Sequence, residues 1–189
     1  MNKRNGFRVG GAVLTGLMLV GSFPGWGQST LVFTALVPLL LAVQSVSTKR
    51  AAGLAWLSGL VFFALSLSWF WKMTQTVDVW LFKAGTLAGF LILVSYCALY
   101  FIPFGLTACW CGKLWKQGSL LQNLRVMLIL TIVWCGAEFL RSTLFSGFGW
   151  NALGVSQYAN PATIQLAERG GVTAVSAVIV WMNAGVFLT

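Results

Sequence analysis

The stretch that decides the fold is residues 84–111, which reads AGTLAGFLILVSYCALYFIPFGLTACWC and carries no charged side chain. As one helix it would be about 42 Å long at 1.5 Å per residue, too long for one upright crossing of a bilayer core and too short for two. Because proline interrupts a helix, we predict a kink or break at Pro103.

Five further apolar runs flank this stretch, and together they predict a polytopic membrane protein of the all-α class. A helix needs about 20 apolar residues to cross a bilayer, so the whole chain is accounted for by about six spans. Pro38 interrupts the second run, which neighbouring helices can accommodate. We expect a single transmembrane domain over 1–189, a bundle with a lateral opening near residues 141–157. The expected spans are 7–22, 30–46, 51–71, 84–111, 125–140 and 172–188, and small residues expected to pack between them are Gly53, Gly59, Gly85 and Gly89.

The composition excludes a water-soluble globular protein. Of 189 residues, 58% are hydrophobic and 8% are charged, and the mean hydropathy is +0.85. A soluble domain carries about a quarter charged residues. The N-terminus has the layout of a signal peptide, with Lys3, Arg4 and Arg8 before an apolar run. No A-x-A-like cleavage site follows, so we expect this first helix to be retained.

The net charge of +9, from 12 basic and 3 acidic residues, is interpreted as a topology signal. Lysines and arginines hold short loops on the cytoplasmic side, whereas a nucleic-acid surface would show a basic stripe with exposed aromatics, which is absent. Both termini are therefore expected in the cytoplasm and the loop 141–171 on the opposite side. The inner side then carries Lys3, Arg4, Arg8, Lys49, Arg50, Lys113, Lys116 and Arg125. The outer side carries Lys72, Lys83, Arg141 and Arg169 with the acids Asp78, Glu138 and Glu168. Tryptophans mark the span ends as well, with Trp110 and Trp115 at an inner end.

The cysteines do not point to catalysis or to a metal. All four lie inside or at the end of apolar runs, where thiols are poor nucleophiles. The spacing of Cys109 and Cys111 does not match common zinc sites, and the chain has no histidine. Cys135 and Glu138 lie on neighbouring helix faces, but no lysine is nearby to activate the thiol. We therefore predict no catalytic residue, no metal and no cofactor in this chain.

Residues 137–157 combine apolar residues with two charged side chains, Glu138 and Arg141. Glu138 and Arg141 are three residues apart and so share one face at the outer end of the fifth span. A carboxylate so close to the apolar region needs a partner. Two interpretations stand: a polar corner whose guanidinium faces a lipid phosphate, or an ion pair that anchors the helix end.

The loop after Arg141 is rich in glycine and aromatic residues and has few charges, so it should sit in the membrane interface or re-enter it. Asn151, Ser156 and Gln157 could bond its backbone. Such a loop suits the entry of acyl chains, and plain packing against neighbouring helices explains it as well. The candidate lipid- or substrate-facing residues are Glu138, Arg141, Phe148, Trp150, Asn151 and Gln157.

This segment resembles the membrane-domain signature of bacterial apolipoprotein N-acyltransferases. The similarity departs at Gly149, where the family usually has proline. The matching stretches are Glu-Phe-Leu-Arg at 138–141, Ser-Gly-Phe-Gly-Trp-Asn at 146–151, Leu-Gly-Val-Ser-Gln at 153–157, Ile164 to Ala167, Gly170 to Val172, Val180 to Asn183, Phe23-Pro24 and Ser68-Trp69.

The resemblance implies an enzyme of the bacterial inner membrane that moves an acyl chain from a phospholipid to the N-terminal diacylglyceryl-cysteine of a lipoprotein. In the family, a Glu–Lys–Cys triad in a periplasmic nitrilase-like domain performs the reaction. No such triad is found in this sequence, so we expect the membrane region only, inactive alone and served by a separate catalytic domain. The alternative is a non-enzymatic membrane scaffold or a small transporter, and a nitrilase-like reading frame directly downstream would favour the enzyme.

Overall fold

The computed structural model of the chain describes residues 3–73, 79–114 and 119–188, and all regular structure in these ranges is helical. This confirms the all-α class. Asp78, Trp115 and Lys116 lie outside the described residues. The elements are α1 (Lys3–Ser22), η1 (Ser29–Phe33), α2 (Val37–Ala42), α3 (Thr48–Ser66), α4 (Trp69–Met73), α5 (Trp80–Leu99), α6 (Phe101–Leu114), α7 (Leu120–Thr143), η4 (Leu144–Ser146), η5 (Leu153–Gln157), α8 (Pro161–Ile164) and α9 (Ala167–Leu188).

Within the described residues, three helical segments are long and apolar enough to cross a membrane: Trp80–Gly112, Leu120–Thr143 and Ala167–Leu188. Only 28%, 28% and 33% of their most apolar windows are buried inside the protein. Apolar side chains occupy the remaining faces, and Ile92 and Ile132 are 70% and 60% exposed. A water-soluble protein rarely exposes contiguous apolar surface of this kind, whereas hydrocarbon covers it readily.

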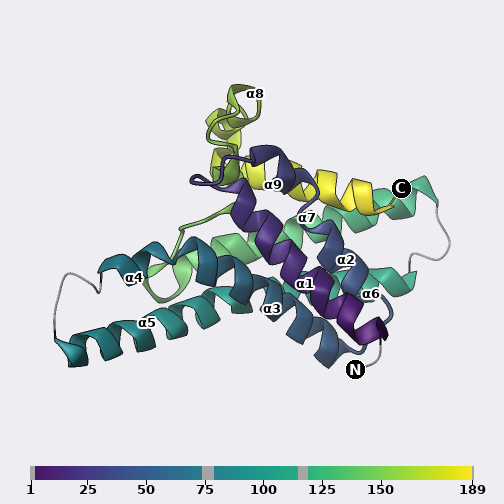
Figure 1. The fold of residues 1–189 in the computed structure, drawn as a ribbon. Helices are drawn as coiled ribbons and strands as arrows, with labels where there is room; N and C mark the ends of the chain where they lie inside the picture. Colours follow the sequence, from purple (N-terminus) through teal and green to yellow (C-terminus); the bar gives the residue numbers. More distant parts are fainter. Residues whose placement is uncertain (1–2, 74–78, 115–118, 189) are drawn as a thin grey trace.

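The other three predicted spans remain predictions. α1 and α3 are long helices, but basic residues occupy their first turns, and α1 also holds several glycines. The 30–46 run is not one helix, because it divides into η1 and α2, a short apolar unit over Ser29–Ala42. In Figure 1 both chain ends lie on the right, whereas the start of α5 lies at the far left.

Two prolines decide where helices break. Proline has no N–H, and its ring clashes with the carbonyl four residues earlier. For Pro103 that carbonyl belongs to Leu99, where α5 ends, and Pro103 lies in the first turn of α6. The predicted break is therefore confirmed, a few residues before the proline itself. Pro38 repeats the pattern, because it lies in the first turn of α2 and η1 ends at Phe33.

A buried side-chain amide from α9 bonds the backbone groups that the break between η1 and α2 leaves without helical partners. In an unbroken helix, the Leu36 N–H would donate to the Val32 carbonyl. Here Leu36 N–H donates to Asn183 Oδ1 (2.8 Å), and Asn183 Nδ2 donates to the Val32 carbonyl (2.7 Å). A hydroxyl on α1 serves the next turn, since Leu39 N–H donates to Thr15 Oγ1 (2.9 Å). Backbone groups in an apolar environment must be bonded, so these side chains allow the chain to bend there.

Helix α3 lies at the centre and packs against α1, α5 and α6 (Figure 1). Its Phe62 and Phe63 join Phe101 and Trp134 in an aromatic cluster with ring centroids 4.8–6.2 Å apart.

Four glycines were expected to pack between helices, and the structure confirms this only for Gly59. A Cβ at Gly59 would lie 2.8 Å from the Ala98 Cα, so α3 and α5 touch there. The prediction is wrong for Gly53, Gly85 and Gly89, which have no neighbouring atom within 4 Å of a built Cβ.

This contrast gives a matched pair of variants. Gly59→Ala forces α3 and α5 apart, and overpacking of this kind typically costs about 1–3 kcal/mol of unfolding free energy. Gly85→Ala meets open space and should stabilise α5 by about 0.5–1 kcal/mol, because alanine is the better helix former. Thermal unfolding in detergent measures both. Equal midpoints for the two variants would contradict the proposed contact.

Candidate functional site at the end of α7

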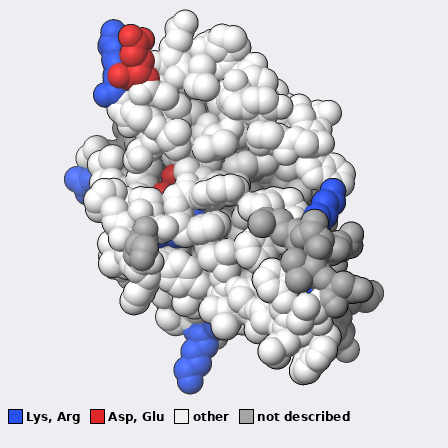
Figure 2. Space-filling view, turned by 90° about the vertical axis from the view of Figure 1, so that its left-hand side faces the viewer, with Lys and Arg blue, Asp and Glu red and all other residues white. Residues whose placement is uncertain are grey.

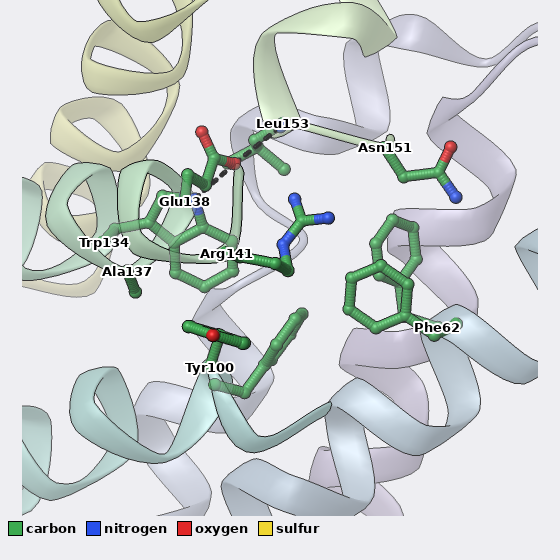
Figure 3. A pocket seen from close by; sticks show the side chains of 10 residues that line it. Phe62, Tyr100, Trp134, Ala137, Glu138, Arg141, Asn151 and Leu153 are labelled. Atoms are coloured by element: carbon green, nitrogen blue, oxygen red, sulfur yellow. Dashed lines mark hydrogen bonds between the residues drawn. The ribbon is translucent and has the colours of Figure 1, made fainter. Parts of the chain in front are cut away.

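Glu138 and Arg141 lie in the last turns of α7 and, as their spacing predicts, face the same small cavity (Figure 3). The cavity of about 20 Å³ is closed by aromatic side chains of α3, α6 and α7 and by the following loop. That volume suffices for about one water molecule. Arg141 is therefore enclosed by protein, Glu138 is half-buried, and neither charged group faces a large ligand space at this point.

Arg141 binds the loop that follows it. Its side chain is only 3% exposed, and Nη1 donates to the carbonyl oxygens of Phe148 (2.8 Å) and Trp150. The Phe148 N–H donates in return to the Arg141 carbonyl (2.8 Å). The guanidinium also lies 5.1 Å from the centroid of the Phe63 ring, within the range of a cation–π contact.

Glu138 binds the same loop further along the chain. Its Oε1 accepts hydrogen bonds from Trp134 Nε1 (2.9 Å) and from the Leu153 N–H (2.7 Å). No ion pair joins Glu138 and Arg141 in the described structure, so the interpretation as an anchoring ion pair is wrong. In the part of the chain that the structure describes, the groups that bind these two charges have no other hydrogen-bond partner. We call Trp134, Glu138 and Arg141 the loop clamp.

The clamped loop has an unusual backbone. Phe145 and Asn151 adopt left-handed conformations, with φ of 51° and 58°. Gly147 has φ of 77°, and a Cβ there would collide with the Ser142 carbonyl. Only glycine fits this position without strain, and the resulting turn brings Phe148 back to the Arg141 carbonyl.

The loop presents a stack of aromatic rings at the surface. Trp150 is 56% exposed and stacks on Trp69 at 5.3 Å between ring centroids. Phe148 also stacks with Trp150, at 6.2 Å between ring centroids. Because the clamp holds the backbone of both loop residues, the position of these rings depends on Arg141.

A larger cavity opens beside this stack, and we call it the outer cavity. Its volume is about 360 Å³, within the range of ligand sites. Figure 2 shows the face toward which the start of α5 points, and this face is largely uncharged. The few basic and acidic atoms visible near its middle do not belong to residues that line the outer cavity. The polar groups of the outer cavity are Ser66, Ser68 and Asn151, and its apolar walls are Val20, Phe23, Pro24, Trp26, Leu65, Trp69, Trp150 and Val155.

The remaining candidate residues differ in position. Asn151 lines both cavities and its Nδ2 donates to Ser66 Oγ (2.8 Å), which ties the loop to the end of α3. Gln157 is completely buried. Its Nε2 donates to the Ser29 carbonyl (2.9 Å), and its Oε1 accepts from Asn160. Gln157 thus holds the loop to η1 and has no atom at the surface.

Cys135 lies on α7 beside α9. Its Sγ lies 3.8 Å from the Thr173 carbonyl of α9, so the thiol and Glu138 do not form a nucleophile–base pair. Across residues 3–73, 79–114 and 119–188, no group of three or more acidic or cysteine side chains is placed to hold a metal ion.

Sequence reasoning missed several residues of the site. Trp134 is four residues before Glu138, so helical spacing could have identified it as a partner. Phe63 and Ser66 come from α3 and give no sequence signal for contact with residues some 80 positions away. Ser176 accepts from the Gly154 N–H (2.9 Å) and holds η5 against α9.

Comparison with known proteins supports one assignment. The family model described as "Apolipoprotein N-acyltransferase N-terminal domain" matches residues 15–185. An apolipoprotein N-acyltransferase of Geobacter metallireducens is 33% identical over 178 residues, which cover 93% of this chain and 32% of that protein. The one from Pasteurella multocida is 27% identical over 180 residues, covering 92% of this chain and 30% of that protein. The chain spans about a third of the length of these curated relatives.

The loop clamp gives a prediction with an internal control. Glu138→Leu removes the acceptor of two hydrogen bonds, and leaving such groups unpaired costs about 1–3 kcal/mol each. Glu138→Gln keeps an acceptor oxygen and should lose less than half as much stability. Arg141→Met should loosen the loop around Phe148 and Trp150, because their carbonyls lose their donor while the bonds of Leu153 to Glu138 and of Asn151 to Ser66 remain. Thermal unfolding and limited proteolysis within residues 143–153 measure these effects. Identical cleavage of Arg141→Met and the unmodified protein would show that the clamp does not hold the loop.

Proposed function

Because this chain belongs to the apolipoprotein N-acyltransferase N-terminal domain family, we propose that it is the membrane region of an enzyme that acylates lipoproteins. The reaction moves an acyl chain from a phospholipid to the amino group of an N-terminal diacylglyceryl-cysteine. The observation that carries the proposal is the outer cavity beside the clamped loop, within the matched residues. It joins apolar walls to three polar side chains, as a lipid ester with its acyl chain requires.

We place the chain in the bacterial inner membrane with six spans and both termini in the cytoplasm. The three apolar spans supply part of this arrangement. α1 and α3 contribute two further crossings of about 30 Å, at 1.5 Å per residue. The η1–α2 unit crosses in two pieces, bonded at its break by Asn183. Residues 141–171, with the loop clamp and the outer cavity, then face the periplasm.

Each candidate residue has a role in this proposal. Glu138 and Arg141 are positioning residues that hold the loop backbone. Phe148 and Trp150 form the apolar surface over which an acyl chain enters. Asn151 supplies an amide toward the glycerol ester region, and Gln157 fixes the far end of the loop.

The bond-making chemistry lies outside the residues described. Transfer through an acyl-enzyme requires an activated nucleophile, a base and donors for the developing oxyanion. We propose that a nitrilase-like domain with a Glu–Lys–Cys triad supplies them, either in the same polypeptide or as a partner. The membrane region concentrates and orients the phospholipid and the lipoprotein beneath that domain. Purified residues 1–189 are then expected to form no thioester with phosphatidylethanolamine.

Topology can be tested with introduced cysteines. Phe145 is 87% exposed in the loop after α7, and Ser47 is exposed at the turn before α3. In intact spheroplasts, a membrane-impermeant maleimide should label Phe145→Cys, whereas Ser47→Cys should react only after permeabilisation. The unmodified protein controls for its own four cysteines. Labelling of both sites from outside would refute the arrangement.

The outer cavity can be tested in the native polypeptide that carries this chain, with phosphatidylethanolamine and a diacylglyceryl-cysteine peptide. Trp150→Ala should raise KM for phospholipid about three- to tenfold, since a stacked aromatic contributes about 0.5–1.5 kcal/mol. The kcat should change little, because the side chain does not touch the reacting atoms. Trp110→Ala is the matched control, being 60% exposed on a different helix, α6. A fall in kcat at unchanged KM would place Trp150 in another role, and the intact mass of the preparation shows whether the catalytic domain is attached.

A further inference from the structure

A second amphipathic site lies away from the loop clamp, between α1 and α2. It consists of two adjoining cavities that share Phe7 and Leu41. The first is an apolar groove of about 590 Å³, and the second is a polar cavity of about 450 Å³ at one end of it. Both volumes are typical of ligand sites. We refer to the pair as the N-terminal groove.

The apolar part follows one face of α1. Phe7, Gly11, Leu14 and Met18 recur at the three- and four-residue spacing that places side chains on one side of a helix. Gly10 leaves the floor open, because a Cβ there would have no atom within 4 Å. The opposite wall is formed by Thr34, Val37, Pro38 and Leu41, with Val186 of α9 at one side.

This part offers a ligand almost no polar partner. Among the described residues of the lining, Thr34 is the only one with a polar side chain, and its hydroxyl already donates to the Leu31 carbonyl (3.3 Å). An unpaired polar group buried there would lose its hydration without compensation, so the groove selects hydrocarbon.

The polar part carries positive charge only. Arg4 and Arg8, one turn apart on α1, line it with Gln44 and Ser45, and no acid is among its described lining residues. Arg8 Nη2 donates to the Gln44 carbonyl (3.3 Å), which leaves further donors of its fork for an anion. The neighbouring Arg50 differs, because its guanidinium is engaged by Asn5 (2.6 Å).

We infer that the N-terminal groove binds one anionic phospholipid, with an acyl chain along α1 and the phosphate between Arg4 and Arg8. Neither half suffices to define the ligand: the groove alone fits any hydrocarbon, and two arginines alone fit any anion. Their continuity through Phe7 and Leu41 requires a molecule that is hydrocarbon at one end and anionic at the other. This site is separate from the outer cavity and does not depend on the proposed acyl transfer.

Native mass spectrometry of the purified full-length polypeptide, delipidated and titrated with phosphatidylglycerol, tests the site. We expect a saturable adduct of one lipid, and weaker adducts with phosphatidylcholine, which has no net charge. Replacing both arginines, Arg4→Gln with Arg8→Gln, should weaken binding at least about tenfold, since each basic residue near anionic lipid contributes about 1 kcal/mol. The double variant Lys49→Gln with Arg125→Gln removes the same charge from exposed positions outside the groove and should bind normally.

Two further variants test the apolar part of the N-terminal groove. Gly10→Leu fills the groove without meeting any atom at its Cβ and should abolish the adduct. Gly6→Leu also enters open space, lies outside the lining and should leave binding intact. Gly6 and Gly10 also form a small-residue face that suits helix pairing. Equal loss in both variants, together with a change of oligomeric state, would show a helix–helix interface and overturn the lipid site.

Glycerophosphoglycerol, which has the headgroup but no acyl chains, separates an anion site from a lipid site. It should compete with phosphatidylglycerol only at concentrations orders of magnitude higher. Competition at equal concentration would overturn the proposal, as would binding of phosphatidylcholine and phosphatidylglycerol with the same affinity.

Discussion

The structure depends on one constraint, that backbone polar groups in an apolar environment need partners wherever a helix is interrupted. Regular helices satisfy the constraint by themselves, but this chain bends where Pro38 interrupts its second apolar run and again after α7. At the first bend, the amide of Asn183 bonds the groups that an unbroken helix would have joined. At the second, Arg141 and Glu138 bond the carbonyls and the N–H of the loop.

The same constraint explains how a buried arginine, Arg141, and a half-buried glutamate, Glu138, are accommodated near the end of a membrane helix. A buried charge is costly unless hydrogen bonds compensate it. Arg141 and Glu138 each bind backbone groups that would otherwise be unpaired. The same hydrogen bonds therefore compensate both the burial of the charges and the loss of helical partners by the backbone. The aromatic rings of Phe148 and Trp150 are held in place as a result, which connects a structural requirement to the proposed lipid surface beside the outer cavity.

The outer cavity and the N-terminal groove differ in chemistry because different elements line them. The outer cavity has neutral polar groups from the end of α3 and from the clamped loop. The N-terminal groove has arginines from the first turns of α1, where a basic sequence also serves topology. A neutral polar lining suits a lipid that must exchange, whereas paired arginines beside a hydrocarbon groove suit a lipid that stays bound.

The sequence by itself determined what depends on neighbours along the chain. Hydrophobic runs predicted helices and a membrane environment, the ring of Pro103 predicted a break, and a spacing of three placed Glu138 and Arg141 on one face. The break before Pro38 was not predicted, because the 30–46 run was expected to form one span. Only the tertiary structure decided the partners of the site residues. Phe63, Ser66 and Leu153 have no local signature as partners. Of the two interpretations of Glu138 and Arg141, the ion pair does not form, because both side chains bond backbone groups of the loop instead. The burial of Gln157 and the open surroundings of Gly53, Gly85 and Gly89 likewise depend on contacts between helices, and periodicity along one helix does not specify which helix lies opposite.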